Sequence, residues 1–170
     1  MSCFWPFVLY EKAGIEMFTP NMLVLDANIL VRAVLGQKVR KILISYHEKV
    51  HFFTPEVCFE DAEKYLPVLL EKRNVSSTLG LNVISFLREF VQSVDVEIYK
   101  AQELSAKKRI ATRDINDWPI VATALVLSCP IWTEDQDFFG SGLATWTTDR
   151  IPIFLEDMDE RLPLQKALCV

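Results

Sequence analysis

Residues 113–138 have the sequence RDINDWPIVATALVLSCPIWTEDQDF and are the stretch most informative about the fold. The apolar residues 116–128 predict a buried helix, and Pro119 is tolerated because it lies in the first turn. The short apolar run 131–133 follows and ends in acidic residues, which is typical of a buried parallel strand. A helix that leads directly into such a strand is the repeating unit of α/β proteins.

The same alternation continues toward both ends of the chain. Short apolar runs predict further strands at residues 22–25 (MLVL), 51–53, 94–98 and 144–147. Helical patterns lie between them, at residues 29–35 and 39–46, from Thr54-Pro55 toward Pro67, at 77–92, and from the third strand to about residue 108. The order of elements therefore predicts a parallel sheet built from βαβ units.

Composition narrows the class of protein. The chain has 170 residues, 51% of them apolar, and a net charge of −5, which suits one globular domain without a broad nucleic-acid-binding surface. Its five glycines match neither the dinucleotide-binding motif nor the P-loop motif. Its four cysteines form no CxxC pair, so neither a disulfide framework nor a zinc ribbon is indicated, and we expect a reduced, cytoplasmic chain.

Three segments are expected. Residues 22–155 form the domain, residues 1–21 are an N-terminal extension of uncertain role, and residues 156–170 are a tail or a docking helix. The apolar residues 1–10 lack a basic region and are too short to span a bilayer, so we expect no membrane association.

Four carboxylates have positions that suit a shared site. Asp26 and Asp135 follow apolar strands, Asp117 lies in the first turn of the most apolar helix, and Glu60 lies in the helix after the second strand. Ligands of open α/β sheets bind at the carboxyl ends of the strands. Four clustered carboxylates repel one another, and Mg²⁺ or Mn²⁺ would relieve that repulsion. The matching chemistry is metal-assisted attack of water on a phosphodiester.

Each acid also has a structural explanation. Asp26 and Asn28 could cap the helix that follows them, Asp114 and Asp117 could be acids at a helix start, and Glu60 could lie on a solvated helix face. The spacing of the acids alone leaves both interpretations open.

Three stretches together resemble the PIN-domain ribonuclease family, which includes the toxin halves of bacterial toxin–antitoxin pairs. They are MLVLDANIL (residues 22–30), TPEVCFEDA (residues 54–62) and the stretch 113–138, and the resemblance covers about residues 22–140. It implies a three-layer α/β/α fold with a central, mostly parallel five-stranded sheet. It also implies a metal-dependent endoribonuclease that hydrolyses RNA with metal-activated water and no protein nucleophile.

The resemblance also implies roles for individual residues. The expected catalytic acids and ligands of Mg²⁺ or Mn²⁺ are Asp26, Glu60, Asp117 and Asp135. The expected supporting residues, which orient carboxylates or waters, are Asn28, Thr133, Asp137 and Asp114. Glu56 and Glu63 share a helix face with Glu60, so either could take its place.

The expected partners are an RNA substrate, an antitoxin protein and a second copy of the chain. Candidate phosphate contacts are Arg32, Lys107, Lys108, Arg109 and Arg113, although such residues are often only a solvated surface.

Two alternatives to the nuclease stay open. One is a catalytically silent PIN module that binds RNA or a protein partner. The other is a zinc protease, because residues 47–51 (HEKVH) match the HExxH pattern. That pattern requires His47 and His51 on one helix, whereas the sequence places His51 in an expected strand.

Overall fold

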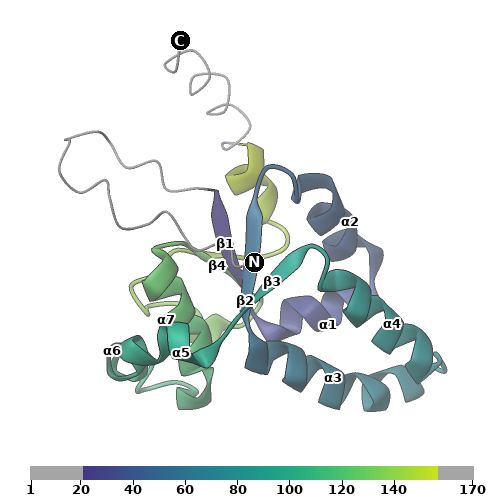
Figure 1. Cartoon of the computed structure of the whole chain (residues 1–170), viewed down its shortest axis with the longest axis horizontal. Coiled ribbons are helices and arrows are strands. Elements are labelled where there is room, and N and C mark those ends of the chain that lie inside the picture. The colour runs from purple at the N-terminus through teal and green to yellow at the C-terminus, as the bar shows by residue number, and fades with distance from the viewer. Residues whose placement is uncertain (1–20, 157–170) are drawn as a thin grey trace, which may run out of the picture.

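The computed structural model describes residues 21–156 (Figure 1). The expected N-terminal extension and C-terminal tail lie outside the described residues, except for Asn21 and Glu156. The strands are β1 (Met22–Leu25), β2 (His51–Pro55), β3 (Val91–Val94), β4 (Ile131–Trp132) and β5 (Thr145–Trp146). They form one sheet in the order β3-β2-β1-β4-β5, and every pair is parallel.

Helices cover both faces of this sheet, so the fold is a three-layer α/β/α sandwich (Figure 1). The helices of one group pack against one another, and they are α1 (Ala27–Leu35), α2 (Gln37–Tyr46), α3 (Glu56–Glu71) and α4 (Ser77–Leu87). The second group contains α5 (Val96–Tyr99), η1 (Lys100–Gln102), α6 (Glu103–Arg109), η2 (Ile115–Asp117) and α7 (Trp118–Leu127). A 3₁₀ turn, η3 (Gln136–Phe138), follows β4. The expected fold class is confirmed, with a sheet that is fully parallel.

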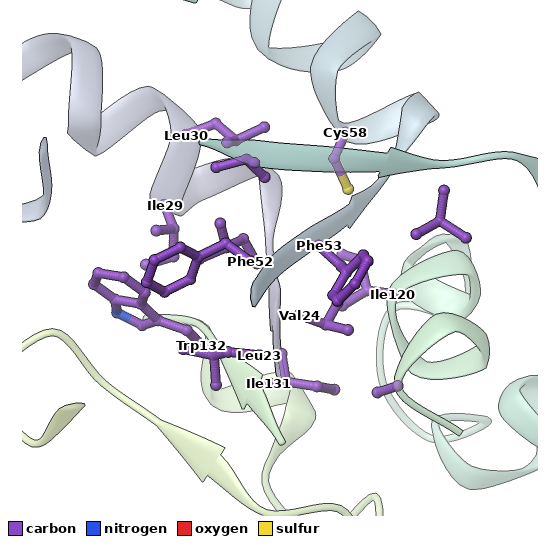
Figure 2. Close-up of a cluster of buried hydrophobic side chains, with 14 of the residues drawn as sticks. Leu23, Val24, Ile29, Leu30, Phe52, Phe53, Cys58, Ile120, Ile131 and Trp132 are labelled. Carbon is purple, nitrogen blue, oxygen red and sulfur yellow. The ribbon is translucent and has the colours of Figure 1, made fainter. Parts of the chain in front are cut away.

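The core lies on both faces of the central strands (Figure 2). Because side chains alternate along a strand, Phe52 and Trp132 point toward α1, whereas Val24 and Phe53 point toward α7. Trp132 is fully buried, and its indole nitrogen donates a hydrogen bond of 3.2 Å to Oγ1 of Thr148. The fully buried β1 thus has helices on both sides, as its unbroken apolar sequence predicts.

Several expected boundaries were wrong, including the end of the second strand, which continues through Thr54 to Pro55. The third strand is residues 91–94, not 94–98, because the carboxylate of Asp95 accepts a hydrogen bond from the Glu97 backbone N–H and caps helix α5. Helix α4 therefore ends at Leu87 instead of at residue 92. Helix α3 begins at Glu56 after Pro55, which ends β2, and continues past Pro67. Its buried face, which includes Ala62, Leu66 and Leu70, runs across the proline.

The strand order positions the site. The chain moves from β1 outward to β2 and β3, and then returns to β4 on the other side of β1. Helices in the two directions lie on opposite faces, so a crevice opens between the carboxyl ends of β1 and β4. Asp26 directly follows β1, and Thr133 to Asp135 directly follow β4.

Candidate functional site

Asp26 lies at the centre of the crevice between β1 and β4. Its backbone N–H donates to the Trp132 carbonyl (3.1 Å), and its carboxylate caps α1 by accepting from the Asn28 N–H (3.4 Å). The residue is only 6% exposed. Burial raises the pKa of this carboxyl, and the charge of Asp135 raises it further, whereas hydrogen bonds from Thr133 and the backbone oppose the shift. The capping explanation is therefore correct for Asp26. Its carboxylate also accepts hydrogen bonds from the side chains of Asn28 and Thr133.

Thr133 and Asn28 tie the ends of the two strands together. Oγ1 of Thr133 donates to Oδ2 of Asp26 (2.6 Å) and accepts from the backbone N–H of Asp135 (2.9 Å). The side-chain amide of Asn28 also donates to Oδ2 of Asp26, and its carbonyl oxygen accepts from the Glu134 N–H (3.4 Å). Both side chains thus hold the Asp26 carboxylate in one orientation, which is the arrangement expected of supporting residues.

Asp117 faces the same crevice from the other layer. It ends η2 and immediately precedes α7, which is buried on nearly all sides. Burial, followed by the charges of Asp26, Asp114, Asp135 and Asp137, raises the pKa of Asp117 from 3.8 to about 7. These five aspartates form one electrostatic cluster, which we call the acidic site.

The outer members of the acidic site also cap short helices. Asp135 accepts from the Asp137 N–H (2.9 Å) at the start of η3, and Asp114 accepts from the Asn116 N–H (2.9 Å) at the start of η2. Asp137 forms an ion pair with Arg113 at 3.4 Å. Their negative charges nevertheless act on Asp117, so capping and a role in the site are compatible.

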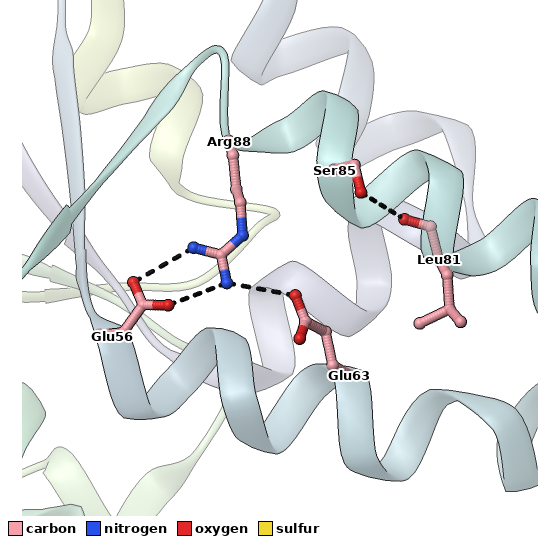
Figure 3. Close-up of polar contacts among 5 residues, drawn as sticks. All are labelled: Glu56, Glu63, Leu81, Ser85 and Arg88. Atoms are coloured by element: carbon pink, nitrogen blue, oxygen red, sulfur yellow. Dashed lines mark hydrogen bonds and ion pairs between the residues drawn. The ribbon is translucent and has the colours of Figure 1, made fainter.

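Three glutamates of helix α3, Glu56, Glu60 and Glu63, differ in their contacts, and Figure 3 shows the two that bind Arg88. Arg88 donates to Glu56 from both terminal guanidinium nitrogens, at 2.9 and 3.2 Å, and Nη2 also donates to Glu63 at 3.2 Å. Glu60 takes no part in this ion-pair network. Burial and then the charges of Cys58, Asp95 and Glu60 raise the pKa of Tyr99.

Tyr99 connects Glu60 to the acidic site. The Tyr99 ring centroid lies 5.5 Å from that of Trp118, the residue after Asp117. Glu60 is exposed and outside the Arg88 network, its charge acts on Tyr99, and its expected role in the acidic site stays a prediction.

Several of the expected phosphate-binding cations have intramolecular partners. Lys107 pairs with Glu103 (2.5 Å) and lies over the Trp118 ring, Arg109 donates to the Ser141 carbonyl (2.8 Å), and Arg113 pairs with Asp137. Lys108 and Arg32 are exposed, and Arg32 lines a pocket beside Asp135.

The HExxH residues do not form a zinc site. His47 caps the C-terminus of α2, where Nδ1 contacts the Ile44 carbonyl oxygen at 2.7 Å, and its ring packs edge-on against Phe90. His51 begins strand β2. The two imidazoles therefore do not share a helix face, which removes the basis of the zinc protease alternative.

The donor chemistry of the acidic site fits a divalent cation. Hard cations such as Mg²⁺ and Mn²⁺ prefer carboxylate oxygens, and a cation would relieve the repulsion that raises the Asp117 pKa. Within residues 21–156, no three acidic, histidine or cysteine side chains already form a close metal cage. Mg²⁺ usually retains several waters and contacts few carboxylates directly.

Glu134 was missed by the sequence reasoning. One carboxylate oxygen accepts from the Thr148 N–H (2.7 Å), so Glu134 connects β4 to the segment after β5. It also lines an open pocket of about 460 Å³ together with Asn28, Arg32, Asp135 and Gln136. The signal was its place between Thr133 and Asp135, directly after the strand.

Comparisons with known proteins agree with this architecture. The family model described as PIN domain matches residues 24–156. A chain in the crystal structure of VapBC2 from Rickettsia felis, bound to a DNA fragment from their promoter, has a similar fold with a TM-score of 0.57. The match covers 74% of this chain and 98% of that chain at 12% sequence identity. No curated protein matches the sequence significantly. Within residues 21–156, no helix has the length and apolar character needed to cross a membrane.

Proposed function

The chain belongs to the PIN-domain family, and from this premise we propose that it is a metal-dependent endoribonuclease that hydrolyses RNA phosphodiesters. The observation that carries the proposal is the acidic site at the crevice between β1 and β4. There, burial and neighbouring carboxylates raise the pKa values of Asp26 and Asp117. Groups with strongly perturbed pKa values in a cleft are typical of functional sites.

Asp26, Asp117 and Asp135 are the residues proposed to hold Mg²⁺ or Mn²⁺, with Glu60 at the periphery. When bound, the cation supplies positive charge to the phosphodiester and lowers the pKa of an attacking water. The donor chemistry does not distinguish Mg²⁺ from Mn²⁺.

The protein's own residues prepare this site. The hydrogen bonds from Thr133 and Asn28 fix the Asp26 carboxylate, so its oxygens do not have to reorient when a cation or substrate arrives. The capping bonds of Asp135 and Asp114 fix the backbone turns that present these carboxylates to the crevice.

We also propose protein partners. The chain resembles the toxin halves of toxin–antitoxin pairs and shares its fold with a chain of the VapBC2 assembly, which supports an antitoxin partner. The homodimer expected from the resemblance is likewise a proposal, and sedimentation of the purified chain alone and with a candidate antitoxin tests both assemblies.

The nuclease is tested by comparing the wild type with Asp26→Asn and Asp117→Asn. Each protein is incubated with a mixed RNA pool in Mn²⁺, in Mg²⁺ and in EDTA. The expected result is cleavage by the wild type that requires metal and that both substitutions abolish. Cleavage that survives both substitutions would place the active site elsewhere. RNA binding without cleavage by the wild type would identify a silent PIN module instead.

A further inference from the structure

The pocket beside Asp135 continues into a second pocket. The first has a volume of about 460 Å³, and the second has about 490 Å³. They share two lining residues, Arg32 and Glu134, so they adjoin one another, and Asp135 lines only the first. We call the two adjoining pockets the α1 groove. Lys38, Arg73 and Asp149 also line its distal part.

The charges in the α1 groove are partly compensated. Lys38 pairs with Asp149 at 2.5 Å, and the carboxylate of Glu134 accepts the backbone N–H of Thr148. The side chains of Arg32 and Arg73 are exposed and form no ion pair or hydrogen bond with the residues that the structure describes. The groove therefore contains two guanidinium groups with all their donors available.

The opposite side of the acidic site differs. There, Lys107, Arg109 and Arg113 bind a carboxylate, a backbone carbonyl and a second carboxylate of the protein itself. Using these cations for a ligand would require breaking contacts that already exist. On the α1 side, by contrast, Arg32 lines the pocket beside Asp135 and Arg73 lines the adjoining pocket.

We propose that Arg32 and Arg73 bind backbone phosphates of the RNA strand on one side of the scissile bond, so that the α1 groove sets the path of the substrate. This inference rests on the proposed ribonuclease function. A guanidinium group presents paired N–H donors that match two phosphate oxygens. Contacts to phosphates position a strand without selecting its sequence. Arg32 and Arg73 are positioning residues, and the cleavage chemistry stays with the carboxylates.

Binding of a short fluorescein-labelled oligouridine in EDTA tests the groove without cleavage. Fluorescence anisotropy over a series of KCl concentrations gives the Kd and its salt dependence. We expect Arg32→Gln and Arg73→Gln each to weaken binding several-fold and to reduce the slope of log K against log salt by about 0.7 per lost phosphate contact. Arg73→Lys should retain most of the slope because it keeps the charge.

Lys72→Gln is the matched control for Arg73→Gln. Lys72 is exposed, adjacent in sequence and equal in charge, but it does not line the α1 groove. We expect this variant to bind as the wild type does. In cleavage assays with Mn²⁺, the two arginine variants should raise KM and leave kcat unchanged, because the lost contacts are the same in the ground state and in the transition state.

The outcomes separate this inference from the proposed function. If Arg73→Gln and Lys72→Gln have the same salt slope while the wild type binds and cleaves RNA, the groove proposal is overturned and the nuclease stands. If only kcat falls, positioning by the groove is also overturned. If the wild type neither binds nor cleaves RNA, the proposed function itself fails. If both arginine variants bind RNA normally but lose an antitoxin, the groove is a protein-binding surface and the proposal is wrong.

Discussion

The hydroxyl of Thr133 donates a hydrogen bond of 2.6 Å to Oδ2 of Asp26, from a position 107 residues further along the chain. Thr133 is fully buried and Asp26 is 6% exposed, so water cannot readily replace this donor. The bond joins the end of β4 to the end of β1 and orients the central carboxylate of the acidic site.

Thr133→Val should therefore destabilise the protein. The substitution removes one of the two side-chain donors to Oδ2 of Asp26, the other being Asn28, and it leaves the Asp135 N–H without its acceptor. Losing hydrogen bonds at a buried polar site costs about 1–3 kcal/mol of the free energy of unfolding. Urea unfolding at neutral pH measures the change. Thr123→Val is the matched control, because Thr123 is also fully buried and its hydroxyl has no partner among the described residues. The control should leave stability unchanged or raise it, and equal losses in both variants would refute the importance of the bond.

Asp117→Asn should stabilise the metal-free protein at alkaline pH. The pKa of Asp117 is about 7 in the folded state and near 3.8 in an unfolded chain, so between these values the folded state binds more protons. The contribution of Asp117 to stability therefore falls as the pH rises from about 4 to about 7. In EDTA, the thermal midpoint of Asp117→Asn should exceed that of the wild type at pH 8, and the difference should vanish near pH 4.

Asp149→Asn should change stability in the opposite direction from Asp117→Asn. The hydrogen bond from Lys38 lowers the pKa of Asp149, so this carboxylate stabilises the folded state when it is charged. Its removal should cause a slight loss of stability at neutral pH.

Adding Mn²⁺ should raise the thermal midpoint of the wild type more than that of Asp117→Asn, because a cation bound to the folded state stabilises it. A midpoint difference for Asp117→Asn that does not change with pH would contradict the raised pKa.

Glu60→Gln should reduce metal-dependent cleavage, by about 10- to 100-fold if Glu60 supports the metal from the periphery. Glu56→Gln and Glu63→Gln should each lower stability by about 0.2–1 kcal/mol and leave cleavage near the wild-type rate, because both residues bind Arg88 at a partly exposed site. Initial cleavage rates and urea midpoints, measured on all three variants, separate the two effects. A loss of cleavage in Glu56→Gln with none in Glu60→Gln would reverse the assignment.

Gly142→Ala should be more destabilising than Gly140→Ala. Both glycines have positive φ, 78° and 92°, so an alanine at either position costs about 1–2 kcal/mol of backbone strain. At Gly142 the new Cβ would also lie 2.6 Å from Nη1 of Arg109, whereas open space surrounds the corresponding position at Gly140. Displacing Arg109 from the Ser141 carbonyl adds about 0.5–1.5 kcal/mol to the loss of stability in Gly142→Ala. The difference between the two variants should disappear when both are made with Arg109→Ala and compared by thermal unfolding.

The fold was predictable because its strands are buried on both faces. MLVL at residues 22–25 and the apolar run at 131–132 have no polar side, so only a central parallel strand accommodates them. The third strand was misplaced because β3 is an edge strand with the mixed sequence VQSV. The apolar alternation of residues 94–98 was a stronger strand pattern than β3, and the capping by Asp95 that ends the strand was overlooked.

The site was predictable where a residue's position in the chain fixes its position in the sheet. Asp26 and Thr133 directly follow adjacent strands, so the strand order alone brings them together. The sequence does not separate Glu56, Glu60 and Glu63, because the three share one helix face, and only the structure shows that Arg88, at the C-terminal end of α4, binds two of them. The intramolecular partners of the cations also lie far away in the sequence, so the sequence alone does not identify them. For the same reason, it does not reveal that Arg73 lines a groove.

The pairing of β1 with β4 also has a consequence for synthesis of the protein. A ribosome makes β1 early, and the residues that complete the acidic site follow it by more than 100 positions. At about 5–20 residues per second, that interval lasts roughly 5 to 20 seconds. A nascent chain that stops before β4 contains Asp26 and Asp117 but lacks Thr133, Asp135 and the strand that pairs with β1 on this side. Nascent chains without β4 thus lack an assembled acidic site, and only chains that include β4 and the residues directly after it can acquire the activity proposed for it.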